Sequence, residues 1–341
     1  MLFEEIFSMN SRELVIKTLE FDKPERIPRQ LWTLPWAEKR YSREIKIIHD
    51  NYPDDIIISP TFYKEKIPQK GEKFKRGKFV DEWGCTRISI ENGITGEVKE
   101  HLVKDWEDIG KVHIPKERLT IDIDKINGFY SKTDKFVLAG AIQRPFERMQ
   151  FIRRTDNLFV DLIEQPEGFK KLLSKVHEFY KEEIKLWCQT NVDGIFIMDD
   201  WGAQNSLLIN PLIWRKLFKP LYRDYIQIAH TNNKFVFMHS DGYILPIIGD
   251  LIEIGLDAIN SQLFCMNIEE IGEKFKGKIT FWGEIDRQYL LPNGSIKDIE
   301  LAVKKVYENL YINGGIIAQC EFGLGAKPEN IIQVFKTWNS F

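Results

Sequence analysis

Several kinds of sequence signal are scarce or missing in this chain. Only four of its 341 residues are cysteine, and they are widely spaced with no Cys-x-x-Cys pair. This spacing excludes a disulfide framework and a zinc-finger signature, and it favours a reducing compartment. No apolar run approaches the roughly 20 residues that a membrane span needs, and the N-terminal residues lack the long apolar core of a secretion signal. We therefore expect a cytoplasmic protein that does not span a membrane.

The balanced charge and the lack of nucleotide-binding motifs exclude further classes of protein. Lys and Arg number 48 and Asp and Glu 51, so the net charge of −3 implies no nucleic acid or other polyanion as a partner. No G-x-G-x-x-G or G-x-x-x-x-G-K-[ST] loop follows an expected strand, which argues against a dinucleotide site or a P-loop. The basic stretch 64–78 is interspersed with Gly and Pro and is interpreted as a solvated loop. A small molecule is left as the expected partner.

What the chain does have is a regular alternation of strands and helices. Strands are expected at 26–32, 56–58, 136–142, 194–198, 235–238, 257–261, 278–282 and 315–318. Helices are expected at 10–19, 146–154, 158–189 with a break near Pro166, 211–231 with a kink at Pro220, 244–254, 268–275, 296–311 and 328–338. Short connections between alternating elements predict a parallel sheet with right-handed crossovers.

The number of strands decides between two α/β architectures. Eight expected strands favour a closed TIM (β/α)8 barrel over an open, doubly wound sheet. We expect one domain over residues 1–341, with an elaborated N-terminal part at 1–133 and regular βα repeats at 134–341. Alternation from Arg87 to Val98, interrupted by Asn92-Gly93, predicts a β-hairpin in the elaborated part.

Polar side chains gather where the expected strands end. Each alone has an ordinary structural explanation, such as capping a helix or packing in the core. The carboxyl ends of barrel strands nevertheless meet at one mouth, where TIM-barrel enzymes have their active sites. The residues expected at this mouth are Asp199, Asp200, Gln204, His239, Asp241, Gln262, Glu284, Asp286, Cys320 and Glu321.

The residue types at the mouth suit metal or proton chemistry. His239 and Asp241 are two positions apart and lie on one side of an extended segment. Such a pair serves as half of a metal site, or as a histidine oriented by a carboxylate for acid–base work. Adding Cys320 and Glu284 gives a nitrogen, oxygen and sulfur set that zinc accepts in catalytic sites. Without a metal, the acids and His239 remain able to bind or protonate a substrate.

The same strand ends carry a resemblance to a known family. The chain resembles the uroporphyrinogen decarboxylase superfamily, a TIM-barrel group that includes the decarboxylase of haem biosynthesis and the corrinoid- and thiol-dependent methyltransferases. The matching segments are Asp81-Glu-Trp-Gly-Cys85, Leu138-Ala-Gly-Ala141, Asp199-Asp-Trp-Gly-Ala-Gln204 with Pro211, His239-Ser-Asp-Gly242, Gly255-Leu-Asp-Ala-Ile-Asn260, Trp282-Gly-Glu-Ile-Asp286 and Pro328-Glu-Asn330.

The chain departs from both branches of that family. The decarboxylase branch has an arginine-rich N-terminal motif that binds propionate carboxylates, and Arg29 with the next glutamine matches only part of it. Asp54-Asp55 lie near the position of the catalytic aspartate of that branch. The methyltransferase branch has His-x-Cys after the central strand and a second Cys on the last strand. His239 and Cys320 match these positions, but Asp241 replaces the first cysteine.

The resemblance implies an enzyme closer to the methyltransferases. It would move a methyl group between a small methylated substrate, a corrinoid or corrinoid protein, and a thiol or other acceptor. His239, Cys320 and Glu284 would hold zinc, with Asp241 as a further catalytic group. The substrate-binding residues would be Arg29, Asp199, Asp200, Gln204, Gln262 and Asp286.

Two other readings of the same resemblance stay open. One is cofactor-free decarboxylation of uroporphyrinogen III in porphyrin biosynthesis, and the other is a non-catalytic protein that binds a corrinoid or tetrapyrrole. A homodimer is compatible with the family, but no stretch of the sequence identifies a self-complementary face.

Overall fold

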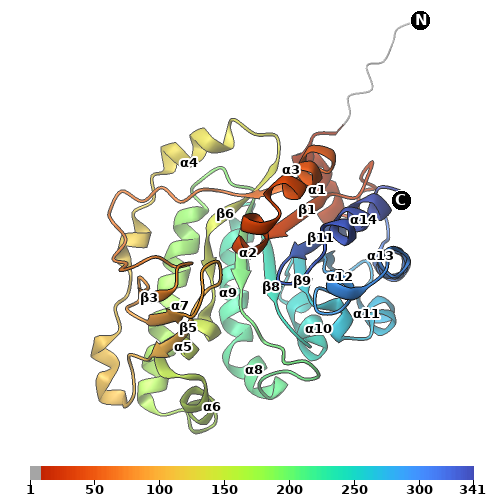
Figure 1. Ribbon diagram of the computed structural model, residues 1–341. Helices are drawn as coiled ribbons and strands as arrows, with labels where there is room; N and C mark the ends of the chain where they lie inside the picture. The colour runs from red at the N-terminus through yellow and green to blue at the C-terminus, as the bar shows by residue number, and fades with distance from the viewer. Residues whose placement is uncertain (1–8) are drawn as a thin grey trace, which may run out of the picture.

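The computed structural model describes residues 9–341 (Figure 1). Residues 1–8, on which the expected lack of a secretion signal rests, lie outside the described residues. Eight parallel strands form one sheet in the order β1-β11-β10-β9-β8-β7-β6-β2. Its two outer strands meet, since the backbone N–H of Asp55 donates to the Arg29 carbonyl at 2.8 Å. The sheet is therefore a nearly closed barrel, and the prediction of a TIM barrel is confirmed.

The helices pack outside the barrel strands, and a small antiparallel sheet, β3-β4-β5, lies beside α5 and α7 (Figure 1). The strands are β1 (Arg29–Thr33), β2 (Ile56–Ile58), β3 (Gly77–Val80), β4 (Thr86–Ser89), β5 (Glu97–Glu100), β6 (Phe136–Gln143), β7 (Gly194–Met198), β8 (Phe235–Ser240), β9 (Ala258–Ser261), β10 (Thr280–Trp282) and β11 (Ile316–Phe322).

The helices are α1 (Ser11–Leu19), α2 (Pro35–Arg40), α3 (Ser42–Asn51), α4 (Ile123–Tyr130), α5 (Pro145–Arg153), α6 (Thr155–Glu164), α7 (Glu167–Trp187), α8 (Pro211–Leu217), α9 (Lys219–Thr231), α10 (Leu245–Glu253), α11 (Ile268–Phe275), α12 (Leu290–Asn293), α13 (Ile296–Leu310) and α14 (Pro328–Trp338). Short 3-10 helices are η1 (Trp106–Lys111), η2 (Lys116–Leu119) and η3 (Leu263–Cys265). Within residues 9–341, no helix is both long enough and apolar enough to cross a bilayer.

Large side chains fill the barrel interior below the mouth. Alternate residues of the strands point inward, so Phe136, Phe196, Phe237 and Trp282 pack together in one buried cluster. The Trp282 ring stands edge-on to Phe237 at 5.1 Å and to Trp32 at 5.0 Å. The barrel is thus solid at this level, and polar chemistry is confined to the strand ends above it.

The N-terminal part differs from expectation in several places. The hairpin is present as β4 and β5, but β3 adds a third strand. Two short helices, α2 and α3, occupy a stretch for which no element was expected from the sequence. Ala37 and Ile48 are their fully buried residues.

The predicted interruptions of two long helices are real. The helical stretch around Pro166 divides into α6 and α7, with Gln165 in a left-handed conformation between them. The kink expected at Pro220 is a break at Phe218, because proline sits in the first turn of α9, where its missing N–H costs no hydrogen bond.

A buried ion pair ties the N-terminal part to the barrel. Arg118 of η2 makes a forked contact with Glu183 of α7, with Nε–Oε1 at 2.8 Å and Nη2–Oε2 at 2.9 Å. Gln143 at the end of β6 donates to the same carboxylate at 3.0 Å. Glu183 is fully buried, so its charge depends on these donors.

We predict that Glu183→Ala lowers the free energy of unfolding by about 1–3 kcal/mol, because Arg118 keeps only its contact with Glu82 and the buried Gln143 amide loses its acceptor. Urea unfolding followed by circular dichroism measures the change. Asp50→Ala is the control, because its pair with Lys46 is exposed and should contribute less than about 0.5 kcal/mol. Equal effects of the two substitutions would contradict the assignment.

Candidate active site

His239 stands at the end of β8 with its ring orientation fixed by a hydrogen bond of Nδ1. Its Nδ1 lies 2.5 Å from Oδ1 of Asn260 on the neighbouring strand β9. The Asn260 amide is fixed in turn, since its Nδ2 donates to the Trp282 carbonyl and, at 3.0 Å, to Oε1 of Gln319. Asn260 therefore offers His239 only an acceptor, so Nδ1 carries a proton and donates it. Nε2 is left to face the mouth.

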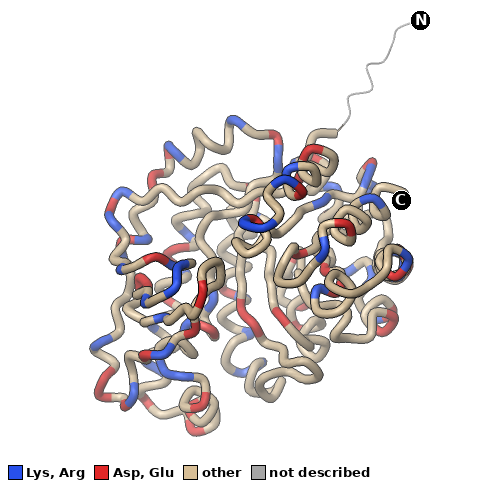
Figure 2. Tube along the Cα trace, in the orientation of Figure 1, with Lys and Arg blue, Asp and Glu red and all other residues tan. Residues whose placement is uncertain are grey.

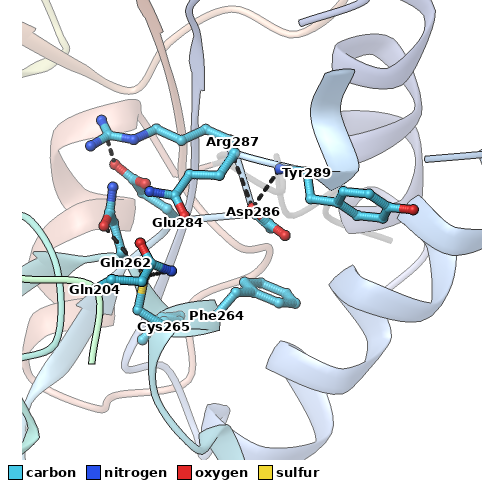
Figure 3. A pocket seen from close by; sticks show the side chains of 10 residues that line it. Gln204, Gln262, Phe264, Cys265, Glu284, Asp286, Arg287 and Tyr289 are labelled. Atoms are coloured by element: carbon cyan, nitrogen blue, oxygen red, sulfur yellow. Dashed lines mark hydrogen bonds and ion pairs between the residues drawn. The ribbon is translucent and has the colours of Figure 1, made fainter. Parts of the chain in front are cut away.

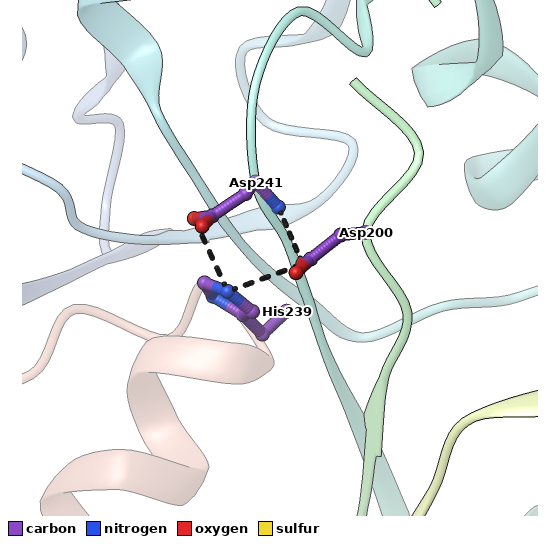
Figure 4. A group of neighbouring side chains, drawn as sticks. All are labelled: Asp200, His239 and Asp241. Atoms are coloured by element: carbon purple, nitrogen blue, oxygen red, sulfur yellow. Dashed lines mark hydrogen bonds and ion pairs between the residues drawn. The ribbon is translucent and has the colours of Figure 1, made fainter. Parts of the chain in front are cut away.

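Two carboxylates surround this free nitrogen (Figure 4). Nε2 is 3.3 Å from Oδ1 of Asp241 and 3.6 Å from Oδ1 of Asp200. The backbone N–H of Asp241 donates to the same Asp200 oxygen at 3.0 Å, which holds the two acidic segments together. His239 is buried, while the Asp200 and Asp241 side chains are 37% and 33% exposed. The cluster is therefore supported from below and accessible from the mouth.

These charges set the protonation of the histidine. Burial alone would lower the pKa of His239, but the Asp241 hydrogen bond and the charges of Asp241, Asp200 and Glu284 outweigh it and raise the pKa to about 9. For Asp241, burial acts to raise the pKa, and His239 and Arg287 together lower it to about 2. At neutral pH the metal-free pair is an imidazolium and a carboxylate.

Arg287 connects this cluster to two more acids. Its Nη2 contacts Oδ1 of Asp241, and its Nη1 lies 3.2 Å from Oε2 of Glu321 and 3.5 Å from Oε1 of Glu284. Glu284 is buried, and its Oε1 has no hydrogen-bond partner within residues 9–341. Burial raises the pKa of Glu284 to about 7, against the opposing charges of Arg287 and His239. A carboxyl group with a pKa near 7 can exchange a proton with a substrate at neutral pH.

A pocket of about 190 Å³ opens beside this acid (Figure 3). Glu284 and Arg287 form one wall, and Gln262 and Gln204 stand opposite with Cys265. Its volume suits a compact small molecule. The residues that line it are Gln204, Gln262, Leu263, Phe264, Cys265, Glu284, Asp286, Arg287, Gln288 and Tyr289.

Most residues expected at the mouth are brought together there. Asp200, His239, Asp241 and Glu284 form the charged cluster with Arg287, and Glu321 joins it through the same guanidinium. Gln204, Gln262 and Asp286 line the adjoining pocket. Asp286 also accepts the backbone N–H groups of Gln288 and Tyr289, so it shapes the loop that carries Arg287.

Asp199 is turned away from the open mouth. It is fully buried and accepts the backbone N–H groups of Phe146 and Glu147 at 2.8 Å each, and the Tyr222 hydroxyl at 2.7 Å. Its neighbour Asp200 faces His239, because successive side chains alternate. Asp199 thus fixes the start of α5 against β7. It affects the site by holding these two elements in place.

The structure does not bring Cys320 into the charged cluster. Gln319 and Glu321, its two neighbours on β11, point inward to Asn260 and Arg287. Cys320 consequently points outward, where it packs in the apolar layer between the strands and the helices. Burial raises the pKa of its thiol well above the usual value, so this cysteine is a protonated core side chain in the metal-free protein.

Arg29 lies at the opposite end of the barrel from His239. It is the first residue of β1, and its guanidinium stands 5.8 Å from the Tyr52 ring centroid. Asp55 lies nearby, where it accepts from the Arg29 backbone N–H and makes a forked pair with Arg26 at 2.7 and 2.6 Å. Both residues therefore hold the lower end of the barrel closed.

The roles of Asn260 and Arg287 were not expected from the sequence. Asn260 follows an apolar run on β9 and lies within a segment already recognised by resemblance. Its position opposite His239 follows from the register in which β8 pairs with β9, and the sequence does not show that register. Arg287 comes directly after the polar group at the end of β10. A cation next to several expected carboxylates was the available signal for its role.

The cluster fits a divalent metal such as zinc. One atom each from Asp200, His239 and Asp241 lies within 4.8 Å of the other two. A neutral His239 would present Nε2 while Nδ1–H stays bonded to Asn260, as metal-binding histidines usually do. Three protein ligands of the nitrogen and oxygen type, with accessible positions left over, are the pattern of catalytic zinc sites. This donor set differs from the predicted one by replacing Cys320 and Glu284 with the two aspartates.

Similarity to a solved methyltransferase structure agrees with the barrel. A methyltransferase from Methanosarcina mazei superposes with a TM-score of 0.70 at 14% identity, covering 98% of this chain and 99% of that one. A B12-independent methionine synthase from Shewanella sp. W3-18-1 has a TM-score of 0.45 at 12% identity, covering 90% of this chain and 85% of that one. At 14% identity the likeness to the methyltransferase concerns the fold.

Sequence comparison identifies the family. No match was found among curated proteins. The family described as uroporphyrinogen decarboxylase (URO-D) matches residues 80–341. This range includes β6 to β11 and every residue of the charged cluster at the mouth. The chain therefore belongs to the uroporphyrinogen decarboxylase family.

Proposed function

We propose that this chain is a methyltransferase that passes a methyl group between a small methylated compound, a corrinoid and a thiol or other acceptor. The observation that carries the proposal is His239, which Asn260 orients so that Nε2 meets Asp200 and Asp241 at an accessible mouth. The similarity of the fold to a Methanosarcina methyltransferase supports the same choice.

Asp200, His239 and Asp241 would hold zinc in this proposal. A zinc ion would supply Lewis-acid chemistry and lower the pKa of a thiol or water bound there. Asn260 keeps His239 in the correct tautomer. Arg287 neutralises part of the charge of Asp241, Glu284 and Glu321, so these acids can remain close together. Cys320 is left out of the ligand set because it faces the helices.

Glu284 would move the proton. A thiol acceptor must lose its proton before sulfur forms a bond to the methyl carbon. Glu284 lines the pocket, and its Oε1 accepts no hydrogen bond within residues 9–341. Gln204, Gln262 and Asp286 would orient the acceptor in the same pocket. The methyl carbon then leaves its donor, whose bonding electron pair stays on the leaving atom.

Methylcobalamin and 2-mercaptoethanol test the activity directly. In the reaction the thiolate takes the methyl group and the cobalt keeps the bonding pair, giving the thioether and cob(I)alamin. We expect zinc-loaded protein to produce this change in the cobalamin absorption spectrum, and His239→Ala to abolish it. Release of CO2 from uroporphyrinogen III, without methyl transfer, would contradict the proposal. Arg29 and Asp55 give that alternative no support, since both lie at the far end of the barrel.

We predict that the chain binds one zinc ion through Asp200, His239 and Asp241. His239→Ala should lower the zinc affinity by at least about 100-fold, and Asn260→Ala by about 10–100-fold because the tautomer is no longer fixed. Affinity should rise with pH from 7 to 9, because Nε2 must first lose the proton that it holds up to about pH 9. Competition with a zinc chelator measures these values.

Cys320→Ala separates the two possible ligand sets. It should leave zinc affinity unchanged, because Cys320 points away from the cluster. His230→Ala is a matched control, since this histidine pairs with Asp257 at 2.8 Å outside the mouth. A large loss of zinc in Cys320→Ala, with no loss in His239→Ala, would overturn the proposed set.

Methyl transfer to a thiol should depend on the ionisation of Glu284. The pKa of Glu284 is about 7 in the metal-free protein, and bound zinc would lower it. The rate should therefore rise with pH as Glu284 loses its proton and reach a plateau near or below pH 7. Glu284→Gln should remove this rise and reduce kcat/KM by about 100-fold. The pH profile of kcat/KM provides the measurement. Glu270→Gln, at an exposed pair with Lys274, is the control. An unchanged profile in Glu284→Gln would rule out this role.

A further inference from the structure

A second cavity lies between the three-stranded sheet and the barrel. Its volume is about 500 Å³, within the range of roughly 300–1,000 Å³ that is typical of small-molecule sites. The loop before β3 supplies Lys73, β4 supplies Arg87, and the end of β6 and α5 supply Ile142, Arg144 and Arg148. Figure 2 shows basic segments of the small sheet beside those of α5.

The cavity wall carries more cations than its acids neutralise. Two of its five basic residues have short contacts with buried acids. Arg118 is engaged by Glu183 and Glu82, and Arg148 donates to Asp81 at 2.6 Å. Of the other three, Lys73, Arg87 and Arg144, only Arg144 pairs with a carboxylate within residues 9–341, that of Glu147 at 3.3 Å.

Lys73, Arg87 and Arg144 have little compensation for their charge. In the described range 9–341, neither Lys73 nor Arg87 makes an ion pair, and Arg87 donates only to the Gly96 carbonyl at 3.1 Å. Arg144 reaches Glu147 at 3.3 Å with Nη1 and turns Nη2 to the sulfur of Met198. Loss of water and the charges of Arg144 and Arg87 lower the pKa of Lys73. Like charges facing one cavity repel one another unless an anion joins them.

We propose that this cavity binds the anionic group, a carboxylate, sulfate-like or phosphate group, of the small molecule that reacts at His239. Lys73 and Arg87 would contact the anion from the small sheet, and Arg144 from the barrel side. Guanidinium groups suit this task because they donate two parallel hydrogen bonds to such oxygens. The basic stretch interpreted as a solvated loop thus contributes a residue to a binding site.

The cavity is next to the candidate active site through Arg144. Arg144 directly follows β6 and contacts Met198, which pairs with His239 across β7 and β8. Paired residues on neighbouring strands are about 5 Å apart, so a molecule held by Arg144 can extend to the mouth. The identification of the anion as part of the substrate rests on the proposed function. The binding of the anion does not.

Calorimetric titration of the purified full chain at fixed ionic strength tests the site. The probes are inorganic sulfate, succinate and succinamide, the last being an uncharged match to succinate in shape. We expect sulfate and succinate to bind and succinamide not to bind. The double variant Lys73→Gln/Arg87→Gln should lose at least about tenfold in affinity for both anions, because two charged donors are removed. Arg87→Lys should lose less, since it keeps the charge.

Controls separate this site from the metal site. Lys75→Gln alters a neighbouring lysine that pairs with Glu72 on the surface, and it should leave anion affinity unchanged, as should His239→Ala. Circular dichroism checks that the double variant is folded, and zinc affinity in that variant should equal that of the unaltered chain. Absence of anion binding in the unaltered chain, or equal binding in the double variant, would overturn the inference. If the unaltered chain binds the anions but does not bind zinc, the proposed function is overturned and the inference stands.

Discussion

The hydrogen bond from Nδ1 of His239 to Oδ1 of Asn260 is the contact on which the mouth of this barrel depends. It joins β8 to β9, and Asn260 is fixed by β10 through the Trp282 carbonyl and by β11 through Gln319. Four consecutive strands thus determine one tautomer. Because all partners are buried over the aromatic interior, water cannot readily replace them. The contacts among these strands therefore determine the direction in which Nε2 points.

The electrostatics of the mouth follow from that direction. Nε2 meets Asp200 and Asp241, and Arg287 compensates Asp241 together with Glu284 and Glu321. The same burial that raises the pKa of Glu284 to about 7 would be unfavourable without Arg287 nearby. A carboxyl group with a pKa near 7 thus lines a small pocket, and beside it stands a histidine that can bind a metal once Nε2 has lost its proton. This arrangement supports both metal binding and proton movement within a single substrate's reach.

Much of the fold could be predicted from the sequence because barrel strands and amphipathic helices leave strong periodic signals. The eight strands were found in that way, and so were the polar ends of β7, β8, β9 and β10. Side-chain direction was harder. Asp199 and Asp200, or Cys320 and Glu321, differ by one position, yet only one of each pair faces the cluster. Residue type suggested Cys320 as a ligand, while its register in the barrel turns it outward. Arg29 was placed by a short motif, which carries no information about the end of the strand on which it stands.

X-ray absorption of the zinc-loaded protein tests the central claim most directly, because it reports the atoms bound to the metal. We expect only nitrogen and oxygen neighbours at about 2.0–2.2 Å, with the scattering pattern of one imidazole. A sulfur neighbour at about 2.3 Å would show that Cys320 or another thiol is a ligand. That result would contradict the account of His239, Asp200 and Asp241 as the metal-binding group.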